Sequence, residues 1–99
     1  MTFLSATLAR RLRQSGFPAP RDRLGILRRH EDITLDELLG NFPKEWALRL
    51  ERNGVWRGQE HWRALAVNIT QTCFNHMEAI ALEPAEAVAE LAILIMGEK

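Results

Sequence analysis

Residues 59–82 read QEHWRALAVNITQTCFNHMEAIAL and form the longest segment of the chain that is compatible with one uninterrupted helix. Gly58 precedes this segment and Pro84 lies just beyond it. On a helical projection of about 100° per residue, one set of its side chains falls within a single arc. The set is Trp62, Leu65, Ala66, Ile69, Cys73, His76 and Ile80. The pattern predicts a long central helix around which the rest of the chain packs.

The first helix is predicted over about 3–15. Thr2 is its expected N-cap, and Gly16 is its expected left-handed stop. Phe17 follows at the position where it can contact Leu12 in a Schellman-type end. Leu4, Leu8 and Leu12 are the expected buried side chains of this helix.

Three shorter segments complete the helical prediction. Residues 21–30 are expected to form a short helix, and 41–53 a further one that stops at Asn53-Gly54. Between them, the Thr34-Leu35-Asp36-Glu37 sequence is a capping box, with Ile33 and Leu38 placed for a hydrophobic staple. This helix is expected to end at Gly40. Pro84 opens the last helix, predicted to run to about 97 antiparallel to the central one.

The composition supports a single folded unit. The chain has 99 residues, of which 46% are hydrophobic and 26% charged, values that argue against disorder. The predicted fold is therefore all-α, a compact bundle of about five helices in one helical domain over 1–99. The single cysteine, Cys73, cannot form an internal disulfide, so a reducing, cytoplasmic setting is expected. No apolar run reaches about 18 residues, so no membrane association is expected.

The arginines of the chain are concentrated at its front. Residues 1–29 hold seven Arg and one Asp, a net charge of +6, although the whole chain is neutral. These arginines are the predicted partner-binding residues: Arg10, Arg11, Arg13, Arg21, Arg23, Arg28 and Arg29. Such a cluster can contact nucleic acid, a protein partner or the acidic segments of the same chain. The sequence alone leaves these three alternatives open.

The end of the last helix is apolar on every side. Ile93 falls on the side marked by Glu86 and Glu90 as solvent-facing, and Leu94 and Met96 flank it. A helix end of this kind is either deeply buried or part of an interface. Ile93, Leu94 and Met96 are therefore the predicted contacts of a homodimer. His76 is added to them, either as a pH-sensitive interface residue or as a hydrogen-bonded core histidine.

The sequence carries no enzyme signature. Cys73 and His76 are three residues apart, a spacing that can serve a thiol and base pair or half of a zinc site, but a structural zinc needs four ligands. No catalytic residue, metal or cofactor is therefore predicted. The predicted function is a small non-enzymatic regulator, adaptor or inhibitor that occupies a partner protein, and the alternative is a small DNA-binding transcriptional regulator.

Overall fold

The chain folds as an α+β protein. The computed structural model describes residues 4–70 and 76–97. In chain order, the elements are α1 (Ala6–Gln14), the 3-10 turn η1 (His30–Asp32), α2 (Leu35–Gly40), β1 (Trp46–Trp56), β2 (Gln59–Asn68), β3 (His76–Ala81) and α3 (Pro84–Gly97). The prediction of an all-α bundle of about five helices is wrong. Strands β2 and β3 occupy most of the described part of the predicted helix over 59–82, and β1 begins within the predicted helix over 41–53.

Within the described ranges, the three strands form one antiparallel sheet in the order β1-β2-β3. A two-residue turn joins β1 to β2, with Trp56 paired to Gln59 and Arg57 and Gly58 between them. Both turn residues have positive φ, 53° and 76°, as a type I′ hairpin turn requires. Gly58 therefore belongs to a hairpin turn and not to the start of a helix.

The strand pattern is obscured because residues 64–67 of β2 are apolar on both faces of the strand. Ala64 and Ala66 point into the core and are fully buried, while Leu65 and Val67 lie on the opposite face. The alternation of polar and apolar residues that marks a half-buried strand is therefore missing from this segment. Alanine and leucine also favour helices in isolation, and pairing with β1 and β3 overrides that preference.

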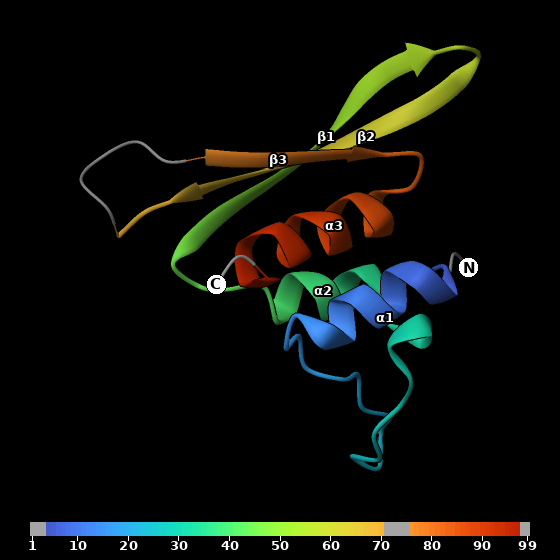
Figure 1. Cartoon of the computed structure of the whole chain (residues 1–99), viewed down its shortest axis with the longest axis vertical. Coiled ribbons are helices and arrows are strands. Elements are labelled where there is room, and N and C mark those ends of the chain that lie inside the picture. Colours follow the sequence, from blue (N-terminus) through green and yellow to red (C-terminus); the bar gives the residue numbers. More distant parts are fainter. Residues whose placement is uncertain (1–3, 71–75, 98–99) are drawn as a thin grey trace.

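Helix α3 is the centre of the structure. It packs against β2 and β3 on one side and against α1 and α2 on the other, so the molecule has a sheet, a middle helix and an outer helical layer (Figure 1). Its start at Pro84 and its end near residue 97 were predicted correctly. Cover on two sides explains why the final turns of α3, with Ile93, Leu94 and Met96, are apolar on every side. The fully buried residues of α3 are Ala87, Val88, Ala89, Leu91 and Ala92.

The two helices of the outer layer carry the end signals that the sequence predicts. In α1, Gly16 has a φ of 93°, and the Phe17 amide donates to the carbonyl of Leu12, which completes the predicted Schellman end. The N-cap is Ser5, whereas the predicted cap, Thr2, lies outside the described residues. The capping box between Thr34 and Glu37 is confirmed in α2.

Candidate functional site

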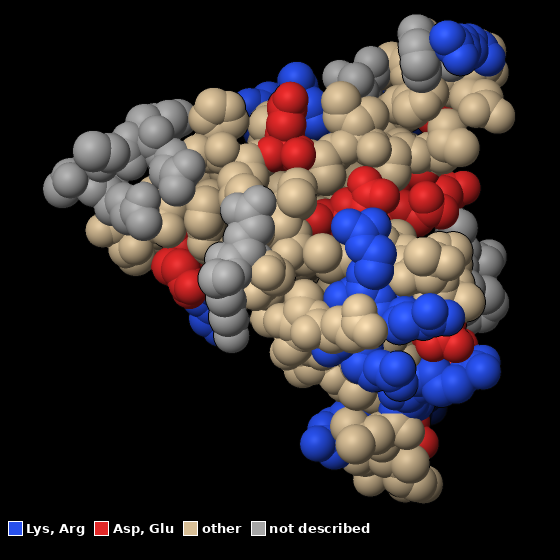
Figure 2. Space-filling view, viewed as in Figure 1, with Lys and Arg blue, Asp and Glu red and all other residues tan. Residues whose placement is uncertain are grey.

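A basic cavity opens between α1 and the segment that leads into η1. Its volume is about 450 Å³. Four arginines line it, together with smaller and apolar side chains: Arg10, Arg13, Arg28, Arg29, Ala6, Ala9, Ala19, Leu27, His30 and Glu31. Lys and Arg side chains gather over this part of the surface (Figure 2). The structure therefore brings four of the seven predicted partner-binding arginines to one concave site.

The fold of α1 directs two of these arginines toward the cavity. Leu8 and Leu12 are buried under the helix, which turns the opposite side of α1 to solvent. Arg10 and Arg13 are three residues apart and therefore neighbours on that outer side. Neither makes an ion pair or hydrogen bond with a residue in the described ranges. Their charges are thus available to an anionic ligand.

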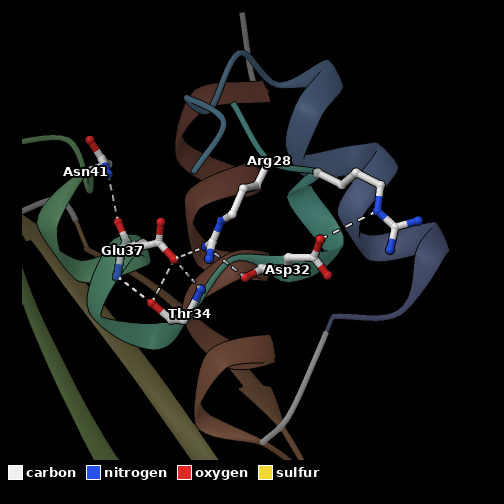
Figure 3. Close-up of polar contacts among 6 residues, drawn as sticks. Arg28, Asp32, Thr34, Glu37 and Asn41 are labelled. Carbon is white, nitrogen blue, oxygen red and sulfur yellow. Dashed lines mark hydrogen bonds and ion pairs between the residues drawn. The ribbon is translucent and has the colours of Figure 1, made fainter. Parts of the chain in front are cut away.

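The other two arginines are held by acidic groups. Arg28 Nη2 lies 2.6 Å from Glu37 Oε1 and donates to the carbonyl of Asp32 at 3.2 Å (Figure 3). Its Nε is buried and has no hydrogen-bond partner within the described part of the chain. Arg29 Nε lies 3.5 Å from Asp32 Oδ2, and its Nη1 lies 3.9 Å from Glu31 Oε2. The acids near the cavity therefore neutralise Arg28 and Arg29, whereas Arg10 and Arg13 keep a surplus of positive charge.

His30 forms part of the cavity wall and ties its two sides together. It is 8% exposed, and its Nε2 donates to the carbonyl of Phe17 at 2.8 Å. This bond attaches the start of η1 to the end of α1. His76, predicted to be either a pH-sensitive interface residue or a hydrogen-bonded core histidine, is exposed on β3. No local pattern marks His30, because its partner is 13 residues away in the sequence.

A projecting loop with exposed apolar side chains borders the cavity. The loop is closed by a bridge between Arg21 and Leu27, so the predicted helix over 21–30 is wrong (Figure 1). Asp22 Oδ1 accepts hydrogen bonds from the Leu24 and Ile26 amides, each at 2.9 Å. Leu24, Ile26 and Leu27 are 85%, 60% and 59% exposed. We call residues 21–27 the apolar loop.

The remaining predicted partner-binding arginines lie outside the cavity lining. Arg21 donates from Nη1 to the carbonyl of Gly25 at 2.7 Å and so stabilises the apolar loop. Arg23 is exposed on the same loop, and Arg11 is exposed on α1. None of these three arginines is part of the cavity lining.

The predicted dimer residues do not share one surface. Ile93, Leu94 and Met96 are partly buried and pack against the core from α3. His76 lies on the face of the sheet that α3 does not cover, because its neighbour Met77 packs inward. The homodimer through the last helix stays a prediction.

A network of charged side chains crosses the uncovered face of the sheet. Arg63 of β2 donates from Nε and Nη2 to Glu51 Oε1 of β1, and its Nη1 lies 3.8 Å from Glu78 of β3. The hydrogen bond from Arg63 lowers the pKa of Glu51 below its ordinary value, and Arg49 adds a smaller effect in the same direction. The same hydrogen bond raises the pKa of Arg63. The network keeps Glu51 ionised and links all three strands.

Residues 4–70 and 76–97 contain no group of three or more His, Cys, Asp or Glu side chains placed to hold a metal ion. Cys73, of the Cys73–His76 pair, lies outside the described residues. Among the helices that are described, none is long and apolar enough to cross a bilayer.

Comparison of the chain with protein-family models, curated proteins and solved structures finds no match.

Proposed function

We propose that this chain is a small non-enzymatic binding protein whose basic cavity holds an acidic segment of a protein partner. The observation that carries the proposal is the convergence of Arg10, Arg13, Arg28 and Arg29 on one cavity. Arginine suits this role because its planar guanidinium forms paired hydrogen bonds with carboxylates. A regulator, adaptor or inhibitor that occupies its partner needs this kind of surface and no catalytic group.

The distribution of paired and unpaired charges assigns different roles to the four arginines. Arg28 and Arg29 are held in place by Glu37, Glu31 and Asp32, so they shape one wall of the cavity. Arg10 and Arg13 have no such acid among the described residues, and their charges attract the ligand. Because both walls are attached to the buried core, a ligand meets a preformed site and loses less entropy on binding than it would at a flexible one.

The apolar loop favours a protein partner over nucleic acid. The side chains of Leu24, Ile26 and Leu27 are exposed to solvent. Leu27 also lines the cavity with the four arginines. A phosphate backbone would neutralise the arginines but leave most of this apolar surface uncovered. A peptide that alternates acidic and apolar residues would cover both parts, with carboxylates in the cavity and aliphatic groups against the loop.

The proposal is tested with a fluorescent peptide of alternating Glu and Leu, measured by anisotropy. We expect saturable binding that Arg13→Glu weakens about tenfold, equivalent to roughly 1.4 kcal/mol. Ile26→Asp is expected to weaken binding of this peptide but not of a peptide of Glu alone. Lys44→Glu is the matched control, because Lys44 is an exposed cation outside the cavity lining.

A random DNA duplex at low and high salt forms the second arm of the experiment. Binding of the duplex with a steep salt dependence, together with no binding of the peptide, would replace the proposal with the DNA-binding alternative. An equal loss of peptide affinity in Arg13→Glu and Lys44→Glu would also contradict it, because attraction would then be a matter of net charge rather than of the cavity.

A further inference from the structure

The sheet has one covered and one uncovered face. Helix α3 packs on the inner face of the sheet, which carries the buried side chains of Ala64, Ala66 and Ala79. No described element packs on the outer face. The register places its side chains in three rows across β1, β2 and β3: Ala47–Val67–His76, Arg49–Leu65–Glu78 and Glu51–Arg63–Ile80. We call this surface the open face.

We propose that a second copy of this chain covers the open face. The apolar part of the surface lies along β2, where Leu65 and Val67 are only partly buried. These two residues border a shallow hollow of about 370 Å³ that also includes Ala47 and His76. Ile80 is 46% exposed at the third row. Aliphatic side chains on a strand pair are a suitable surface for a packed sheet.

The charges of the middle row, Arg49–Leu65–Glu78, favour a second copy of the chain as the partner and determine how the two copies are oriented. Consider two open faces related by a two-fold axis that runs along β2. This operation places β1 of one copy over β3 of the other, so Arg49 faces Glu78 of the second copy and Glu78 faces its Arg49. Leu65 meets its own equivalent at the centre. The strands of the two sheets stay nearly aligned, as they do in sandwiches.

The other in-plane axis is excluded by the same charges. A two-fold axis perpendicular to the strands would place Arg49 over Arg49 and Glu78 over Glu78, which is repulsive. The side chains of Arg49 and Glu78 are 76% and 48% exposed, so both can reach a second copy. The open face is thus self-complementary in only one of the two arrangements.

One contact of the chosen arrangement pairs like charges. Arg63 lies on β2 and therefore faces Arg63 of the other copy. Within its own chain, each Arg63 donates from Nε to Glu51 Oε1 at 2.9 Å. Its Nη1 also lies 3.8 Å from Glu78 Oε2. Arg49 also lies 3.3 Å from Glu51 of its own chain. The two arginines and two acids of each open face therefore sum to zero charge, so the central pair adds no net charge to the contact.

The size of the face predicts a weak dimer. Three strands about 4.8 Å apart, over the six residues of β3 at about 3.4 Å each, outline a patch of roughly 14 by 20 Å, or about 280 Å². A stable specific interface buries about 800 Å² on each partner. The dimer is therefore expected to form only at high protein concentration.

Charge reversal at the middle row tests the proposal by sedimentation equilibrium. Arg49→Glu alone places two Glu–Glu contacts in the dimer, and Glu78→Arg alone places two Arg–Arg contacts. Each variant is expected to dimerise at least tenfold more weakly than the wild-type chain. An equimolar mixture of the two variants is expected to regain dimerisation, because both cross-contacts become Glu–Arg pairs again.

Arg11→Glu is the matched control, with the same change of charge on α1. It is expected to dimerise like the wild-type chain, and circular dichroism checks that every variant is folded. A wild-type chain that stays monomeric up to millimolar concentration would overturn the proposal. So would a mixture that fails to dimerise, or single variants that dimerise as well as the wild type, which would indicate another interface such as the end of α3.

Discussion

Replacing Glu37 with alanine tests how the cavity wall is attached to the fold. Glu37 Oε1 accepts hydrogen bonds from the Thr34 amide at 3.1 Å, from Thr34 Oγ1 at 3.0 Å and from Arg28 Nη2 at 2.6 Å (Figure 3). The side chains of Arg28 and Glu37 are 34% and 25% exposed. One carboxylate thus caps α2 and also holds an arginine of the basic cavity.

The expected cost has two parts. Loss of the capping-box bond removes about 1 kcal/mol from the free energy of unfolding. The ion pair with Arg28 contributes a further ~0.5 to 1 kcal/mol, toward the upper end for surface pairs because both groups are partly buried. Glu37→Ala is therefore expected to destabilise the protein by about 1.5 to 2 kcal/mol, which lowers the melting temperature of a domain this size by roughly 6 to 16 °C.

Glu37→Gln separates the two parts. Its amide oxygen still accepts a bond from the Thr34 amide, whereas the charge that pairs with Arg28 is gone, so the expected loss is only about 0.5 to 1 kcal/mol. The measurement is urea unfolding followed by tryptophan fluorescence, with Glu45→Ala as an exposed control expected to change stability by less than about 0.5 kcal/mol. Equal losses for Glu37→Ala and Glu37→Gln would refute the capping contribution, and a loss in Glu37→Ala no larger than in Glu45→Ala would refute both.

Three further predictions concern the core, the hairpin and the charged network of the sheet. Leu91→Ala removes a fully buried side chain at the centre of α3 and is expected to cost about 2 to 5 kcal/mol in urea unfolding, with a value below 1 kcal/mol arguing against the layered core. In Gly58→Ala, the added Cβ meets no atom within 4 Å, but the residue must adopt a φ of 76°. Backbone strain alone is therefore expected to lower the free energy of unfolding by about 1 to 2 kcal/mol, measured by thermal unfolding. Because Arg63 lowers the pKa of Glu51, stability contributed by this pair is present above the ordinary carboxyl value of 4.5 and is lost as the pH falls below it. Glu51→Gln should therefore flatten the decline of stability in acid, and an unchanged decline would contradict the assignment.

Local signals in the sequence were sufficient to locate the helix ends. The Schellman end at Gly16 and the capping box at Thr34 depend on residues within a few positions of one another, and both are present. Pro84 likewise marks the start of α3. These features are predictable because the side chain and the backbone groups that it satisfies belong to the same turn.

The sheet was missed because strand pairing joins residues that are distant in the chain. Leu48 pairs with Ala66, and Ala66 with Met77, in contacts that no local periodicity reports. The apolar residues of β2 face α3 on one side and the open face on the other, so they resemble a helix that needs two layers of cover. Cover on two sides is instead found at α3, which lies between the sheet and α1.

For the candidate site, the arginine-rich front of the chain could be identified without the fold. Which of these arginines meet depends on how the chain packs. Arg13 and Arg28 share a cavity because His30 bonds to Phe17 and brings the two segments together. The same packing determined which charges are neutralised, since Glu37 reaches Arg28 across nine residues of chain. Contacts of this kind depend on where the buried helices direct the chain, and that arrangement follows from the core as a whole.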